Sequence, residues 1–262
     1  MELFTAAKYI QYFLFSRHRK GHGIHSPFVF DLITRILRNK RVPDFVQRIE
    51  SIRENMKSDP GYINVEDFGS GSRRIHGTKR KISDIARFSA VPEKCGLLLS
   101  QMAEAFGYPL ILEFGTSFGI STMYMASARP DVQVYTMEGS PEICAVAERN
   151  FSEAATRNIR LMRGSFDSLM PSIKGLNMAP GLVFIDGDHR KEPLLKYFNQ
   201  IAEISGNNTV VIIDDIYSGK EMADAWNIIK NHPEVSVTVD IFRMGIVFFR
   251  KGIAKANCVV RY

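Results

Sequence analysis

The chain has 262 residues, of which 45% are hydrophobic and 24% are charged, and its formal net charge is +6. This length accommodates one α/β domain with an appendage and excludes two large domains. The absence of low-complexity tracts and internal repeats excludes solenoid and propeller architectures. Three scattered cysteines, Cys95, Cys144 and Cys258, fit a reducing compartment better than a disulfide framework, so we expect a cytoplasmic protein.

Charge is distributed unevenly along the chain. Residues 1–90 carry 17 Lys and Arg against 9 Asp and Glu, whereas residues 91–262 carry 17 against 19. The change predicts a boundary near residue 90, between a basic N-terminal extension (1–90) and an α/β domain (91–262). The extension would face an anionic partner or simply solvent.

The extension is expected to be helical, with one loop. Apolar residues of Leu3–Phe15 recur at helical spacing, which predicts an amphipathic helix that packs on the rest of the protein or lies on a membrane surface. This run is too short to span a bilayer, and we expect no transmembrane segment. Further helices are expected over residues 27–38 and 44–57. Residues 60–90 are rich in glycine, serine and basic side chains, which indicates a mobile loop.

From residue 91 onward, apolar runs of strand length alternate with helical patterns, which predicts a mostly parallel sheet covered on both faces. Seven strands are expected, at residues 109–114, 132–137, 158–162, 181–185, 209–213, 235–242 and 246–250. Helices are expected at residues 97–106, 120–128, 141–155, 191–204 and 221–230.

Only Arg243–Gly245 lies between the last two strands. Three residues are too few for a crossover helix, so these strands form an antiparallel hairpin. The predicted fold class is therefore α/β, with a Rossmann-like, doubly wound, seven-stranded sheet that ends in a C-terminal hairpin. A NAD-dependent dehydrogenase is disfavoured, because its sheet ends with another parallel strand.

A glycine motif follows the first strand of the α/β domain. Leu112–Gly119 joins a strong strand to a helix, which is the context that a nucleotide-binding loop requires. Gly115 permits a tight turn and Gly119 a close approach to a ligand, while Glu113 can accept a hydrogen bond from an ammonium group. A second motif, Asp67–Ser72, has no preceding strand, so we interpret it as a lid rather than a cofactor loop.

An acidic residue ends the second strand of this domain. Glu138 stands where a carboxylate can accept hydrogen bonds from both hydroxyls of a ribose. Its combination with the glycine motif predicts a ligand that contains ribose.

Acidic residues also end the fourth and fifth strands, in Asp186-Gly-Asp-His189 and Asp214-Asp215. Because the carboxyl ends of adjacent parallel strands converge, Asp186 and Asp214 should be neighbours. The cluster either binds a hard cation such as Mg²⁺, with Asp186, Asp214 and Asp215 as ligands, or caps helices through backbone amides. With Asp186 beside it, His189 is the candidate catalytic base for a substrate hydroxyl.

With these residues, positions 91–250 resemble the class I S-adenosylmethionine-dependent methyltransferases, especially the branch of catechol and caffeoyl-coenzyme A O-methyltransferases. The glycine motif resembles the family's first motif, and Glu138 its ribose-binding acid. The resemblance implies that Ser165 and Phe166 flank the adenine ring and that Gly96 lines the methionine end of the cofactor. The implied cofactor-binding set is Gly96, Glu113, Gly115, Thr116, Ser117, Gly119, Ser121, Glu138, Gly139, Ser165, Phe166 and Asp186.

The same resemblance bears on the acidic cluster. Asp186 and Asp214 match the family's aspartate ligands, whereas Asp215 replaces an Asn and His189 replaces a Lys that acts as base. The segment Gly21–Phe30 and the second glycine motif resemble a group of uncharacterised bacterial methyltransferases.

The leading functional hypothesis is S-adenosylmethionine-dependent O-methylation of a small hydroxylated molecule, with an anionic acceptor as the finer expectation. The basic segment 73–81 would close over the site or meet a phosphate or carboxylate. The basic extension leaves an RNA methyltransferase open, although no RNA-binding module is readable. A non-catalytic protein that binds an S-adenosyl ligand is a third alternative, and a homodimer is left open.

Overall fold

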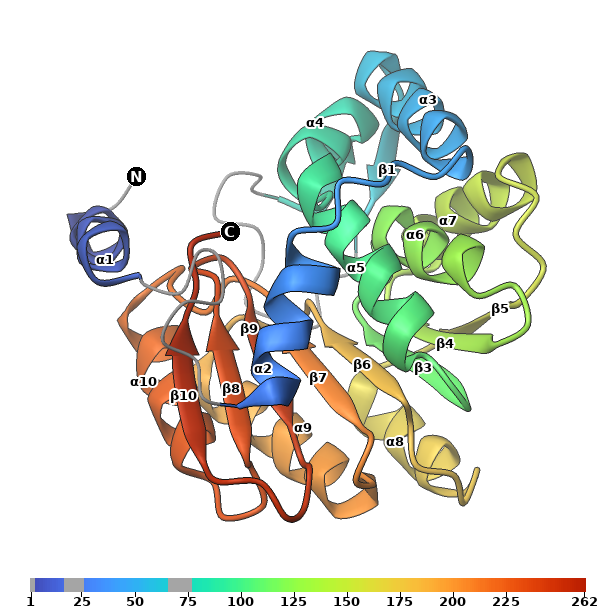
Figure 1. Cartoon of the computed structure of the whole chain (residues 1–262). Coiled ribbons are helices and arrows are strands. Elements are labelled where there is room, and N and C mark those ends of the chain that lie inside the picture. The colour runs from blue at the N-terminus through green and yellow to red at the C-terminus, as the bar shows by residue number, and fades with distance from the viewer. Residues whose placement is uncertain (1–2, 17–25, 66–76) are drawn as a thin grey trace. The chain divides into compact units, whose positions relative to one another are not determined.

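Two units carry the helices and strands of the computed structural model, which describes residues 3–16, 26–65 and 77–262 (Figure 1). The middle unit comprises Arg41–Met178, and the terminal unit comprises Met1–Lys40 together with Ala179–Tyr262. The boundary expected near residue 90 falls inside the middle unit, and it stays a prediction.

Three parallel strands, in the order β3-β4-β5, form the sheet of the middle unit. Their bounds are Leu110–Phe114, Gln133–Glu138 and Ile159–Arg163. Every residue of β3 is buried, as its nearly unbroken apolar run predicts for a central parallel strand. The helices that alternate with these strands are α5 (Glu93–Phe106), α6 (Ile120–Ala128), α7 (Pro141–Glu153) and α8 (Phe166–Lys174), of which α8 was not predicted.

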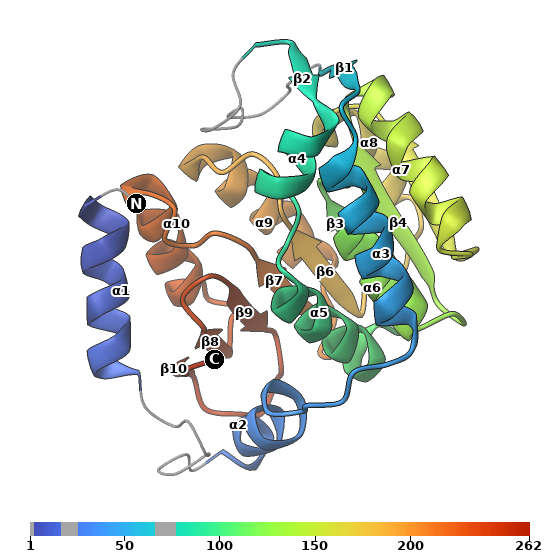
Figure 2. The same cartoon turned by 90° about the horizontal axis from the view of Figure 1, so that it is seen from above.

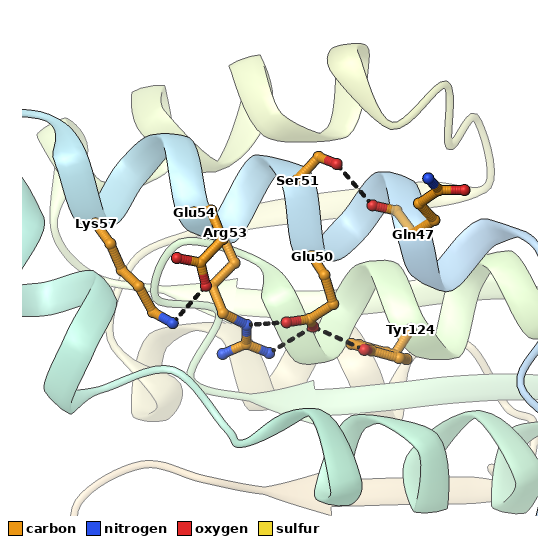
Figure 3. Close-up of polar contacts among 7 residues, drawn as sticks. All are labelled: Gln47, Glu50, Ser51, Arg53, Glu54, Lys57 and Tyr124. Atoms are coloured by element: carbon orange, nitrogen blue, oxygen red, sulfur yellow. Dashed lines mark hydrogen bonds and ion pairs between the residues drawn. The ribbon is translucent and has the colours of Figure 1, made fainter.

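A helix of the basic extension, α3 (Phe45–Ser58), also belongs to the middle unit and lies beside α6 (Figure 2). Its apolar face is buried. Its polar contact with α6 is a chain of three side chains: Glu50 accepts from the Tyr124 hydroxyl at 2.8 Å and from the Arg53 guanidinium at 2.8 and 3.0 Å (Figure 3). Because the side chain of Arg53 is only 6% exposed, this ion pair is largely removed from water.

The prediction of a loop over residues 60–90 is wrong for much of that segment. Strands β1 (Tyr62–Asn64) and β2 (Lys79–Lys81) pair antiparallel, and α4 (Ile82–Phe88) follows directly. Buried apolar side chains in this segment, such as Ile63 and Ile85, supply the packing that the basic composition concealed. The second glycine motif, at 67–72, and residues 73–76 of the basic segment lie outside the described residues.

The terminal unit contains five strands in the order β10-β8-β9-β7-β6. Their bounds, in that order, are Ala256–Val259, Val237–Asp240, Gly245–Phe248, Val210–Ile213 and Leu182–Ile185. β6 pairs parallel with β7, while β9 pairs antiparallel with both β7 and β8, so the predicted hairpin is confirmed. β10, parallel to β8, was not predicted, so residues 91–262 contain eight strands rather than the expected seven.

The remaining helices of the terminal unit are close to their expected positions. They are α1 (Leu3–Phe15), α2 (Pro27–Asp31), the π-helical η1 (Leu32–Leu37), α9 (Lys191–Ile204) and α10 (Lys220–Asn231). The predicted packing of α1 on the protein is present, because the Tyr12 hydroxyl donates to the Val260 carbonyl at 2.7 Å and Thr5 donates to the Tyr217 carbonyl. Within the described ranges, no helix combines the length and the apolarity needed to cross a bilayer.

Candidate functional site

The glycine motif forms a tight loop between β3 and α6. Gly115 (φ 95°) and Gly119 (φ 80°) both adopt left-handed backbone conformations, which glycine reaches without strain. The backbone N–H groups of Gly115 and Thr116 both donate to the Met137 carbonyl at 3.1 Å. The loop is thereby fastened to the end of β4, where the ribose-binding acid was expected.

Glu138 is held in a fixed orientation by this loop. The N–H of Ser117 donates to one carboxylate oxygen of Glu138 at 3.0 Å, and the N–H of Ser140 donates to the other at 3.0 Å. A carboxylate has about four lone-pair sites, so each oxygen can accept a further hydrogen bond from a ligand. Ser117 has φ 48°, an uncommon value for a residue with a side chain and a kind of strain that gathers at functional sites.

The end of β5 joins the same cluster. Gly164 donates its N–H to the Glu138 carbonyl at 2.9 Å, which places the next two residues beside the end of β4. Ser165 caps α8 by accepting from the Ser168 N–H, and the ring of Phe166 packs edge-on against Phe114 with centroids 5.3 Å apart. Hydrogen bonds and a ring contact thus connect the glycine loop, Glu138 and the Ser165–Phe166 pair in the middle unit, and we call this group the loop–Glu138 cluster.

Glu113 has different surroundings from those expected. Its side chain is fully buried, and it accepts from the hydroxyls of Ser121 and Thr136 at 2.6 Å and from that of Thr122. Thr116 shares a 2.6 Å hydrogen bond with Thr136 and extends the group. Burial raises the pKa of Glu113 to about 7, and the three hydroxyls oppose that rise. Its contacts therefore give Glu113 a structural task, and its predicted contact with a ligand ammonium group stays a prediction.

Two of the predicted glycines have packing reasons of their own. A Cβ at Gly96 would lie 2.5 Å from the ring of Tyr124, and a Cβ at Gly119 would lie 2.3 Å from the ring of Phe151. These glycines allow α5 to approach α6 and the glycine loop to approach α7. Their roles in ligand binding stay predictions.

A second polar group, in the terminal unit, follows β6 and β7. The two strands pair Ile185 with Ile213, and the N–H of Asp214 donates to the Ile185 carbonyl at 3.0 Å, so Asp186 and Asp214 follow neighbouring strand ends as expected. The Nε2 atom of His189 lies 3.5 Å from a carboxylate oxygen of Asp186. A carboxylate beside an imidazole is the arrangement that orients a general base.

Asp214 has a partner that sequence reasoning missed. Its carboxylate is 1% exposed and accepts two hydrogen bonds from the Arg243 guanidinium, from Nε at 3.0 Å and from Nη2 at 2.7 Å. Nη2 also lies 3.8 Å from a carboxylate oxygen of Asp215. Burial raises the pKa of Asp214, the neighbouring Asp215 adds to the rise, and Arg243 opposes it. The only sequence signal for this pair was the hairpin turn that contains Arg243.

Comparison with known proteins finds methyltransferases that resemble this chain. Residues 112–216 match the family model described as a methyltransferase domain. A catechol O-methyltransferase from Niastella koreensis is 31% identical over 130 residues, which cover 48% of this chain and 57% of the relative. An O-methyltransferase from Aspergillus flavus is 26% identical over 185 residues, which cover 63% of this chain and 72% of the relative. Over residues 112–216 the chain is therefore similar to methyltransferases.

A solved structure has the same overall fold as this chain. The O-methyltransferase of tomaymycin synthesis from Streptomyces achromogenes, solved in complex with S-adenosylmethionine, superposes with a TM-score of 0.58 at 17% identity. The superposition covers 80% of this chain and 91% of that one. The mostly parallel, Rossmann-like fold expected from the sequence is confirmed, and so is the resemblance to the O-methyltransferase branch. The chain spans little more than half the length of the Niastella relative. These relatives do not support the RNA-methylating or non-catalytic alternatives.

The expectation of Mg²⁺ finds no support in the described residues of this chain. Among residues 3–16, 26–65 and 77–262, no three or more His, Cys, Asp or Glu side chains are grouped so that they could hold a metal ion. The geometry at Asp214 gives a physical reason, because a guanidinium already contacts both of its oxygens.

Proposed function

We propose that this chain transfers a methyl group from S-adenosylmethionine to a hydroxyl oxygen of a small molecule. The observation that carries the proposal is the Glu138 carboxylate, oriented by the N–H groups of Ser117 and Ser140 at the end of β4. A carboxylate fixed in this way is suited to accept from the two hydroxyls of a ribose. The family match over residues 112–216 and the Streptomyces relative, solved with this methyl donor, support the same ligand.

The other members of the loop–Glu138 cluster bind the rest of the donor in this proposal. The N–H groups and small side chains of the glycine loop face the methionine end, and Ser165 with Phe166 lies against the adenine ring. Phe166 offers an aromatic face for that ring, and its packing on Phe114 keeps it in place. The sulfonium of S-adenosylmethionine supplies the activated methyl group, so the protein needs only to align donor and acceptor and to remove one proton.

His189 is the proton acceptor in this proposal. Transfer breaks the methyl–sulfur bond and forms a methyl–oxygen bond, while the proton of the acceptor hydroxyl passes to the His189 imidazole. Asp186, 3.5 Å away, stabilises the resulting imidazolium. This arrangement is consistent with the replacement of the family's usual lysine base by histidine.

The residues present do not fit a divalent metal ion. An ion such as Mg²⁺ at Asp214 would have to lie beside the positively charged guanidinium of Arg243, which already contacts both carboxylate oxygens and repels a second cation. We therefore assign no step of the transfer to a metal. The finer expectations of an anionic acceptor, a homodimer and a cytoplasmic location remain part of the proposal, the last supported by the three free cysteines.

Titration calorimetry with S-adenosylmethionine tests the donor site. We expect micromolar binding by the wild type and at least roughly tenfold weaker binding by Glu138→Gln, since one hydrogen bond to a charged group contributes about 1.5–3 kcal/mol. Glu142→Gln is the matched control, because Glu142 also accepts from a backbone N–H, that of Asn64 at 2.8 Å, outside the proposed donor site. Absence of binding by the wild type, or equal binding by Glu138→Gln, would refute the proposal.

A further inference from the structure

Arg243 and Asp214 form an ion pair in the terminal unit. The carboxylate is 1% exposed, whereas the guanidinium side chain is 37% exposed, so the pair stands with its negative end inside the protein. A buried carboxylate without a counter-charge is strongly destabilising, and a bidentate guanidinium is the most specific partner that a protein can supply.

Backbone hydrogen bonds hold the turn between β8 and β9, which contains Arg243. The carbonyl of Arg243 accepts from the N–H of Ile216 at 3.2 Å, which connects the turn to the segment just after Asp214. Asp240 accepts from the N–H of Phe242 at 2.8 Å, and Phe242 adopts φ 71°. Because hydrogen bonds fix the backbone at Phe242 and Arg243, the Arg243 side chain is preorganised for its contact with Asp214.

We propose that Arg243 is the resident cation of the acidic group after β7, in the place where the sequence suggested a divalent ion. Its guanidinium satisfies both oxygens of Asp214 and contributes positive charge beside Asp215 at 3.8 Å. The chain accordingly has no need of a divalent ion at this position.

The proposal also narrows the class of acceptor, and this step rests on the proposed function. A metal ion selects acceptors that chelate it through two adjacent oxygens and lowers the pKa of the bound hydroxyl. A guanidinium cannot be chelated, and its hydrogen bonds to Asp214 leave deprotonation to His189. The acceptor is therefore a molecule that presents a single hydroxyl to the base, rather than a vicinal diol that must bind a metal through both oxygens.

Metal binding tests the resident cation independently of catalysis. Mg²⁺ and Mn²⁺ are titrated separately into the wild type by calorimetry, without S-adenosylmethionine, and thermal unfolding is compared in EDTA and in about 1 mM of each ion. The wild type should show no heat of binding at Asp214 and the same Tm in all buffers. Wild-type binding of either ion that disappears in Asp214→Asn overturns the proposal.

Removal of the guanidinium should open the place to a metal ion. We expect Arg243→Met to lower the Tm in EDTA by roughly 6–20 °C, because a buried carboxylate loses its partner. Mn²⁺ should bind this variant and recover part of the loss, whereas Arg163→Met, which breaks an exposed pair with Glu148, should respond to neither. A folded Arg243→Met that binds no Mn²⁺ contradicts the proposal.

A third variant covers the case in which Arg243→Met does not fold. Arg243→Lys keeps one positive charge beside Asp214, so it should fold and bind neither ion, and Mn²⁺ binding by this variant counts against the proposal.

The acceptor class is tested last, with enzyme that binds S-adenosylmethionine in the calorimeter. Turnover of single-hydroxyl acceptors that persists in EDTA supports the inference, and a requirement for a vicinal diol together with Mg²⁺ overturns it. Because donor binding is measured separately, failure of the proposed function is distinguishable from failure of this inference.

Discussion

Substitution of Glu113 by Gln should change how the stability of the protein depends on pH. Glu113 is fully buried, and its pKa of about 7 lies above the ordinary value of 4.5. The folded state therefore binds this proton more tightly than the unfolded state does. Stability from this group is fully present below pH 4.5, falls as the pH rises, and is lost once the pH passes about 7.

The size of the effect follows from the two pKa values. At about 1.4 kcal/mol for each pH unit between them, ionisation of Glu113 costs the folded state about 3 kcal/mol between pH 4.5 and 7. Glutamine cannot ionise and has nearly the same shape. Asp214 and Asp240 also have raised pKa values because of burial, but both are present in wild type and variant, so their contributions cancel in the difference.

Urea denaturation at a series of pH values between about 4.5 and 8 measures this difference. The loss of unfolding free energy across the series should be about 3 kcal/mol smaller in Glu113→Gln than in the wild type. Glu153→Gln removes an exposed carboxylate from α7 and should retain the wild-type dependence. Parallel curves for wild type and Glu113→Gln would refute the reasoning, because they would mean that the buried carboxyl group does not change its protonation in this range.

Three further substitutions test other parts of the structure. Glu50→Ala should lower the unfolding free energy by about 3 kcal/mol in urea, because it leaves the buried Arg53 guanidinium without its partner. Glu54→Ala, in the exposed pair of the same helix, should have a much smaller effect (Figure 3), and equal losses would contradict this account. Gly119→Ala should cost about 2–3 kcal/mol, because its Cβ would meet the ring of Phe151 at a positive φ, and a Tm within a degree of the wild type would refute the clash. His189→Gln should lower kcat by about 10²–10⁴-fold without changing the Kd for S-adenosylmethionine, and an unchanged kcat would remove His189 from the proposed mechanism.

Local sequence patterns sufficed for much of the fold but not for its edges. The buried strands β3, β6 and β7 were predictable because each is a short apolar run beside a turn. The edge strand β10 is only partly buried and carries polar residues such as Asn257, so its pairing with β8 left no alternation to detect. The helix α8 contains Pro171, a residue that normally argues against a helix, whereas its N-terminal cap, Ser165, is a common residue that is ambiguous in sequence.

The two parts of the candidate site also differ in whether local sequence or the pairing of distant segments determines them. The glycine loop and Glu138 could be predicted because each follows its own strand and the parallel pairing of β3 with β4 brings them together. Arg243 could not be predicted as a partner of Asp214, 29 residues earlier, because their contact depends on how the final hairpin pairs with β7. A carboxylate at a strand end is therefore ambiguous in sequence: it is a metal ligand if its oxygens stay open and half of an ion pair if a turn delivers a guanidinium. In this chain the antiparallel return of β9 decides between the two, so the feature that distinguished the fold from a dehydrogenase also supplies the charge beside Asp214.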